Sequence, residues 1–225
     1  MLALFVGSSP AESEEPIVFD ADAQAALTPD AVLENLMAGN ARYVAGELTH
    51  AEHLNEQVAA TVSGQYPQAI ILSCVDSRVP VEMVFDQGLG DIFVARVAGN
   101  VENVDILGSM EFAAVAAGSK LIMVLGHQSC GAISGACDYV QMGNLTSLLE
   151  KLEPALQEVQ KQHPEMERSS ENAAFVEHAV RTNVERTVAD IRRNSPVLAE
   201  MEAEGAIKIV GAYYSLEDGS VSLLH

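Results

Sequence analysis

The sequence predicts an α/β fold with a mostly parallel central sheet covered by helices. Three short apolar runs, at 69–73, 92–97 and 121–125, have the length of strands and are bounded by turn residues. Their apolar character is continuous rather than alternating, which is typical of strands buried on both faces. Helical patterns separate the runs, so we expect a single α/β domain over residues 28–225.

The composition supports a folded domain and argues against two classes of partner. A chain of 225 residues with 48% hydrophobic residues can fill a sizeable core. Its 12 Lys and Arg and 32 Asp and Glu give a formal net charge of −20. Such a surface repels phosphate groups, so neither nucleic acid nor an anionic membrane is an expected partner. No stretch reaches the roughly 18 continuous apolar residues that a membrane-spanning helix needs.

Residues 1–27 are expected to form an N-terminal arm outside the domain. Residues 12–26 are acidic and small without a sustained period, which indicates an extended segment. The apolar residues 2–6 and the small residues after them resemble the tail of a secretory signal, although no Lys or Arg precedes Arg42. The stretch is interpreted either as a signal remnant of a periplasmic protein or as an ordinary apolar arm of a cytoplasmic one.

Capping residues predict two helices ahead of the first strand. Thr28, Pro29 and Asp30 have the residue types of a helix start, and Gly46 has that of a helix end. A second helix is expected from about residue 54 to residue 62.

The remaining elements follow from periodicity and turn residues. A helix of small residues is predicted at 106–117, with long helices at 144–162 and 170–194, and Pro196 closes the last of them. Residues 207–214 and 221–224 are predicted to end the chain as a hairpin.

Two motifs with reactive side chains follow two of the predicted strands. Cys-Val-Asp-Ser-Arg at 74–78 comes directly after the first strand, and Gly-His-Gln-Ser-Cys-Gly at 126–131 comes directly after the third. Open α/β sheets bind ligands at the carboxyl ends of their strands. If both strands belong to one parallel sheet, Cys74, His127 and Cys130 meet at the same edge.

Two thiolates and one imidazole form a ligand set that suits tetrahedral Zn²⁺. Three protein ligands leave one position for water or substrate, which is typical of a catalytic zinc. A rival interpretation makes Cys74 or Cys130 a nucleophile activated by His127, but two cysteines with one histidine favour the metal. Cys137 lies two turns along a helix predicted to begin at Gly131, so its side chain should be about 10 Å from Cys130. That distance is too large for both residues to bind one ion. We therefore interpret Cys137 as a buried core residue.

The residues and their spacing resemble the β-class carbonic anhydrases of bacterial type. The resemblance runs from about Thr28 to the C-terminus. Besides the two motifs it includes Gln65, the stretch 93–100 and the pair 111–112.

The resemblance implies a zinc enzyme and assigns roles to five residues. Cys74, His127 and Cys130 would bind one Zn²⁺ per subunit, and Asp76 and Arg78 would form a catalytic dyad. The implied reaction is the reversible hydration of CO₂ to bicarbonate and a proton by attack of zinc-bound hydroxide. Asp76 is expected either to be held by Arg78 and to orient the nucleophile, or to be released and to occupy the open position on zinc in an inactive state.

The resemblance also implies a substrate pocket and an oligomer. Gln65 would help to hold bicarbonate, Gly131 would lie at the substrate, and Phe93, Ala98 and Phe112 would line a narrow apolar pocket. Part of this pocket would lie across the interface of a homodimer or tetramer.

Two alternative functions and one departure accompany this reading. Relatives with the same ligand pattern hydrolyse COS or CS₂, and a non-catalytic zinc-stabilised scaffold is a third possibility.

Some bacterial members have a bicarbonate inhibitory site with a Trp three residues before the first zinc cysteine, where this chain has Ile71. That form of inhibition is therefore not expected, although Arg96 aligns with the arginine of that site. A structural role beside an acidic side chain is the alternative for Arg96.

Overall fold

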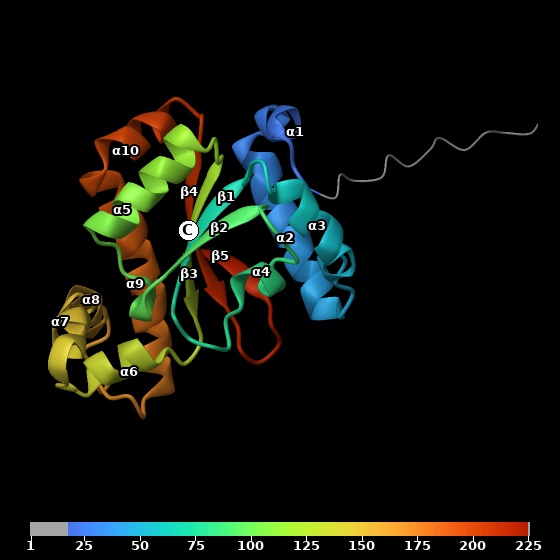
Figure 1. The fold of residues 1–225 in the computed structure, drawn as a ribbon. Coiled ribbons are helices and arrows are strands. Elements are labelled where there is room, and N and C mark those ends of the chain that lie inside the picture. Colours follow the sequence, from blue (N-terminus) through green and yellow to red (C-terminus); the bar gives the residue numbers. More distant parts are fainter. Residues whose placement is uncertain (1–17, 225) are drawn as a thin grey trace, which may run out of the picture.

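The computed structural model describes residues 18–224 and confirms the predicted α/β fold (Figure 1). Its five strands are β1 (Ala69–Ser73), β2 (Ile92–Arg96), β3 (Leu121–His127), β4 (Lys208–Tyr214) and β5 (Val221–Leu224). They form one sheet with the order β2-β1-β3-β4-β5. The first four strands are parallel, and β5 pairs antiparallel with β4 as the predicted closing hairpin.

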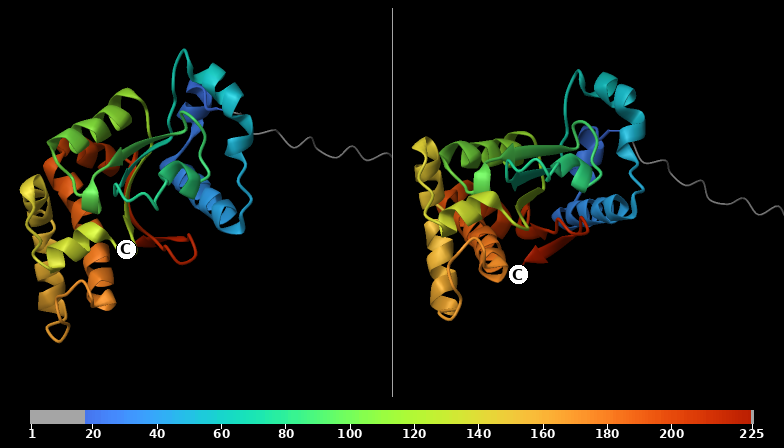
Figure 2. Two further views of the ribbon diagram at one scale, coloured as in Figure 1. Left: turned by 60° about the horizontal axis from the view of Figure 1, so that its bottom comes forward. Right: turned by 90° about the horizontal axis from the view of Figure 1, so that it is seen from below.

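Helices cover both faces of this sheet (Figure 2), which explains why the central strands β1 and β3 are mostly apolar and buried along their whole length. On one face Ile71 of β1 belongs to the same buried cluster as Leu36 of α2 (Pro29–Ala45). On the other face its neighbour Leu72 belongs to a cluster with Val184 of α9 (Ala173–Asn194). Successive residues of a strand point to opposite faces, so both faces of β1 are buried.

The two helices predicted ahead of the first strand are confirmed as α2 and α3 (Leu54–Thr61). The side chain of Thr28 accepts a hydrogen bond from the amide of Ala31 at 3.2 Å and so caps α2. Gly46 ends α2 with a φ of 74°, a left-handed conformation that glycine adopts readily. A 3-10 turn, η1 (His50–His53), precedes α3.

The expectation of an extended segment up to residue 26 is wrong for its last part, because Ala21–Ala26 form a short helix, α1. Asp20 caps α1, and the buried Gln24 donates hydrogen bonds to the carbonyls of Pro67 and Ala117, each at 2.8 Å. These tertiary contacts leave no periodic pattern in the sequence. The signal-like stretch and the rest of the arm up to residue 17 lie outside the described residues.

The long helix predicted at 144–162 is instead two helices, α7 (Gly143–Glu150) and α8 (Glu153–Gln162). Pro154 explains the division, because proline fits the first turn of a helix but not its interior. The helix predicted at 106–117 begins earlier, as α5 (Val104–Glu111), and continues into a π-helical turn, η3 (Phe112–Ala116).

Three further elements differ from or extend the prediction. The helix expected at 170–194 is α9, which begins at Ala173 and ends at Asn194. Pro196 does follow its end, but it also begins α10 (Pro196–Ala203), which the sequence reasoning missed together with the short α4 (Val81–Val84). Among residues 18–224 no helix has the length and apolar character needed to cross a membrane.

The register of the sheet brings the two motifs together. Ser73, the last residue of β1, pairs with Leu125 of the adjacent parallel β3. Cys74 therefore leaves the sheet at the same edge as His127, the last residue of β3. Cys130 directly precedes α6 (Gly131–Cys137), which starts where the sequence predicts. The candidate ligands Cys74, His127 and Cys130 therefore all lie at the carboxyl edge of β1 and β3.

Candidate metal centre and active site

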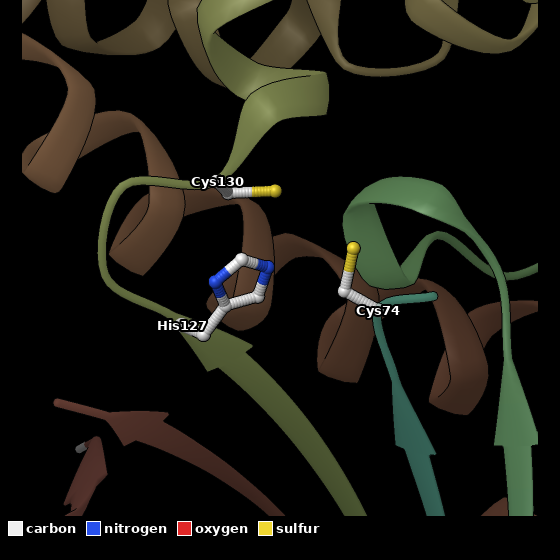
Figure 3. A group of neighbouring side chains, drawn as sticks. All are labelled: Cys74, His127 and Cys130. Carbon is white, nitrogen blue, oxygen red and sulfur yellow. The ribbon is translucent and has the colours of Figure 1, made fainter. Parts of the chain in front are cut away.

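Cys74, His127 and Cys130 point toward one another at the carboxyl ends of β1 and β3 (Figure 3). The atoms that could serve as ligands all lie within 4.8 Å of one another, and we call these three residues, which could hold a metal ion, the metal-binding group. All three residues are buried, with at most 4% of their surface exposed. The convergence predicted from the topology is therefore present in the folded chain.

The imidazole of His127 is held with one nitrogen available as a ligand. Its Nδ1 lies 2.9 Å from the carbonyl oxygen of Gln128, and because a carbonyl only accepts, Nδ1 carries the proton. Nε2 is then the unprotonated nitrogen. It is buried and has no hydrogen-bond partner within the described residues. An unpartnered buried acceptor is costly, and a metal ion among these soft donors would satisfy it.

The two thiols influence each other strongly. A hydrogen bond with Cys130 lowers the pKa of Cys74 against the opposing effect of burial, and the amide of Gly99 lowers it further. The pKa of Cys130 is raised, first by its contact with Cys74 and then by burial. The pair therefore holds one thiolate readily. The remaining proton is the one that a divalent cation would displace.

Asp76 and Arg78 form a two-pronged ion pair beside this group. Arg78 Nε donates to Asp76 Oδ1 at 3.0 Å, and Arg78 Nη2 donates to Oδ2 at 2.8 Å. The bonds from Arg78 lower the pKa of Asp76 to about 2, so the group remains a carboxylate at neutral pH. Asp76 Oδ2 lies 3.9 Å from His127 Nε2. Of the two expected arrangements of Asp76, the structure has the one in which Arg78 holds it.

Arg96 supports the loop that leads from Cys74 to Asp76. The sequence reasoning did not foresee this role. Its Nε donates to the carbonyl of Cys74 at 2.8 Å, and its Nη2 donates to the carbonyl of Asp76 at 2.5 Å. Arg96 is exposed and binds backbone oxygens rather than an acidic side chain, so the structural alternative considered for it is wrong in that respect. Backbone carbonyls carry no sequence signal, which is why this role was missed.

Gly99 is a second supporting residue that the sequence reasoning did not single out. Its amide lies 3.4 Å from Cys74 Sγ, and its carbonyl accepts a hydrogen bond from Asn183 at 2.8 Å. It has a φ of 72°, and an added Cβ would lie 3.0 Å from Leu152. A glycine three residues after the end of β2 is the signal that could have identified this position.

The residues expected at the substrate divide into two groups. Gly131 begins α6 next to Cys130. Apart from its chain neighbours and the backbone of its own helix, no atom lies within 4 Å of where its Cβ would be. Ala98 precedes Gly99. Phe93 and Phe112 instead contact each other, with ring centroids 6.0 Å apart, and line a surface hollow of ≈ 690 Å³ that the metal-binding group does not reach. Gln65 precedes β1 and so lies toward the amino ends of the strands.

Cys137 lies in the hydrophobic core, as predicted. It is 1% exposed and belongs to a cluster with Leu149 and Phe175. It is not part of the metal-binding group, and within residues 18–224 no fourth side chain joins that group. The donor set is therefore three-membered, which leaves room for a ligand from solution.

Comparisons with known proteins agree with this geometry. The sequence model of the family described as carbonic anhydrase matches residues 69–221. Carbonic anhydrase 2 of Mycobacterium tuberculosis is 36% identical over 200 residues, which cover 87% of this chain and 92% of that protein. The β-carbonic anhydrase CcaA is 25% identical, with a TM-score of 0.68, and the match covers 86% of this chain and 95% of that one.

A further comparison concerns the fold alone. One of two tetrameric β-carbonic anhydrases from Sordaria macrospora aligns with a TM-score of 0.66 at 23% identity, over 85% of this chain and 96% of that one. Family, sequence relatives and fold thus lead to the same assignment. The chain belongs to the β-class carbonic anhydrases.

Proposed function

We propose that this chain hydrates CO₂ reversibly with one Zn²⁺ held by Cys74 Sγ, His127 Nε2 and Cys130 Sγ. The observation that carries the proposal is the buried, unpartnered Nε2 that lies with two sulfur atoms in a group no wider than 4.8 Å. Two soft thiolates and an imidazole are the donors that zinc prefers. Zinc with an open position acidifies the water that it binds and so supplies a nucleophile near neutral pH.

Asp76 and Arg78 are proposed as the catalytic dyad. The carboxylate of Asp76 can only accept hydrogen bonds, and it lies beside the three donors. It can therefore accept a hydrogen bond from an O–H group at the reacting centre and fix the orientation of that group. Arg78 engages both carboxylate oxygens, which prevents Asp76 from turning toward the metal-binding group.

The amino end of α6 is proposed to bind the substrate. Gly131 has no side chain there, so the backbone next to Cys130 is open to a small molecule. Ala98 precedes Gly99, whose amide lies 3.4 Å from Cys74 Sγ, and its small apolar side chain is proposed to line the same space without filling it. CO₂ is small and uncharged, so an acidic protein need not attract it electrostatically.

We further propose that the chain functions as a homodimer or tetramer in which Gln65, Phe93 and Phe112 serve the site of a partner subunit. Within one chain these residues lie away from the metal-binding group. Phe112 is 55% exposed, and β2 is an edge strand, so both are accessible to a second copy. The tetrameric relative from Sordaria macrospora supports such an assembly. The catalytic domain is proposed to span residues 28–225.

Stopped-flow CO₂ hydration combined with zinc analysis tests the function. The wild type should contain one zinc per chain and hydrate CO₂, and Asp76→Asn should keep the zinc and lose most of the activity. Hydrolysis of COS or CS₂ without CO₂ hydration would favour the alternative activity, which the comparisons do not support. Zinc without either activity in the wild type would mean a structural site.

A further inference from the structure

Gln128, between two of the proposed zinc ligands, is bonded to the C-terminal hairpin through both its backbone and its side chain. Its amide donates to the carbonyl of Tyr214 at 2.9 Å. Its Oε1 accepts a hydrogen bond from the amide of Leu216, and its Nε2 donates to Glu217 Oε1, both at 2.9 Å. Three hydrogen bonds thus fix Gln128 to the end of β4 and to the turn that follows it.

The hairpin that receives these bonds is itself anchored to α2. Asn40 donates to the carbonyl of Gly219 at 2.9 Å and accepts from the amide of Val221 at 2.8 Å. Asn40 also donates to the carbonyl of Val84 at 3.0 Å, which ties the same side chain to α4. The support behind Gln128 is therefore a part of the fold and not a free loop.

The backbone that Gln128 fixes contacts both a proposed zinc ligand, His127, and a member of the proposed dyad, Arg78. The carbonyl of Gln128 accepts the proton of His127 Nδ1 at 2.9 Å, and this bond leaves Nε2 free for a metal. The carbonyl of Ser129 lies 3.4 Å from Arg78 Nη2. Ser129 has a φ of 53°, a conformation that a residue with a Cβ keeps only when its surroundings hold it. The loop needs an external support, and Gln128 provides it.

We propose that Gln128 is a positioning residue whose side chain fixes the tautomer and direction of His127, and thereby the affinity and geometry of the metal centre. The inference rests on the proposed function, since it concerns the same zinc site. Residues that orient a metal-binding histidine typically contribute 10- to 100-fold to metal affinity or activity. The side chain of Gln128 does not itself contact a ligand and acts only through the backbone, so we expect a loss in metal affinity at the lower end of this range, about tenfold.

The test compares Gln128→Ala with two other variants. Glu217→Gln keeps an oxygen acceptor for Gln128 Nε2 and is the conservative variant. Gln157→Ala is the matched control, because it removes a similar bond, from Gln157 Nε2 to Glu153 Oε1 at 3.0 Å, on the exposed surface of α8. The measurements are the Zn²⁺ dissociation constant by chelator competition, the visible absorption of the Co²⁺-loaded protein and the melting temperature of the metal-free protein.

Gln128→Ala should weaken Zn²⁺ binding about tenfold and alter the Co²⁺ bands, whereas Glu217→Gln and Gln157→Ala should match the wild type. A lower melting temperature with unchanged affinity and unchanged bands would make Gln128 merely structural and would overturn the inference while the proposed zinc site stood. A wild type that binds no zinc would refute the proposed function, and the inference with it. If Gln128→Ala does not fold, Gln128→Met keeps the length of the side chain and carries the same expectation.

Discussion

Arg78→Ala is expected to reduce catalysis without removing zinc. The substitution deletes two hydrogen bonds to Asp76, at 3.0 and 2.8 Å, but leaves the bond from the backbone amide of residue 78 to Asp76 Oδ1 at 2.9 Å. It touches none of the three proposed ligands. Asp76 would lose its restraint and could turn toward the metal-binding group, which is the inactive arrangement expected from the family resemblance.

The magnitude follows from the exposure of the pair. A hydrogen bond to a charged group contributes about 1.5–3 kcal/mol when it is well buried. Arg78 is 53% exposed and the Asp76 side chain is 15% exposed, so solvent screens much of this interaction. We expect a loss of about 1–2 kcal/mol for the two bonds together, which corresponds to a fall in kcat of roughly tenfold.

Stopped-flow CO₂ hydration and zinc content per chain are measured on the same samples. Arg181→Ala is the matched control, since it removes a comparable exposed pair in which Arg181 Nε and Nη2 reach Glu177 at 3.1 and 3.0 Å. Arg78→Lys keeps the charge but not the paired geometry and should fall between Arg78→Ala and the wild type. Loss of zinc in parallel with activity, or an unchanged kcat, would refute the assigned role of Arg78.

Three further predictions concern stability and assembly. Gly39→Ala should destabilise the fold by about 3 kcal/mol in urea unfolding, because its Cβ would lie 1.9 Å from the backbone oxygen of Phe85; a normal unfolding midpoint would contradict that packing. Asp86 accepts bonds from Arg42, Thr49 and His50 that outweigh burial and lower its pKa to about 2. Asp86 therefore contributes about 2 kcal/mol to the free energy of unfolding above its unfolded pKa near 3.9, and this contribution is lost as the pH falls toward 2. The difference in stability between wild type and Asp86→Asn should accordingly shrink from pH 6 to pH 3. Phe112→Arg, at an exposed position, should lower the molar mass in solution and the activity while the monomer stays folded; an unchanged mass would refute the proposed interface.

The parts of the fold that sequence reasoning predicted are those with local signals. β1 and β3 were recognisable because four consecutive apolar residues at 69–72 and five at 121–125 are typical of strands that helices cover on both faces. α1 was missed because its formation depends on Gln24, whose partners Pro67 and Ala117 are distant in sequence. Pro196 signals the end of α9, but proline in the first turn is equally a helix start, so the sequence alone does not reveal α10.

The site divides in the same way. The ligand triad could be predicted because parallel strands deliver Cys74 and His127 to one edge without any knowledge of the loops. The proton position on His127 could not be predicted, because it depends on where one backbone carbonyl lies. Neither could the role of Arg96, whose partners are also backbone oxygens.

Zinc K-edge X-ray absorption on the wild-type protein tests the central claim most directly. Two sulfur ligands at about 2.3 Å and two nitrogen or oxygen ligands at about 2.0 Å are expected, from two thiolates, one imidazole and one molecule from solution. The chain has only three cysteines, so a third sulfur in the shell would require Cys137 to leave the core. A shell with three sulfurs, or a protein that retains no zinc, would contradict an open three-ligand centre.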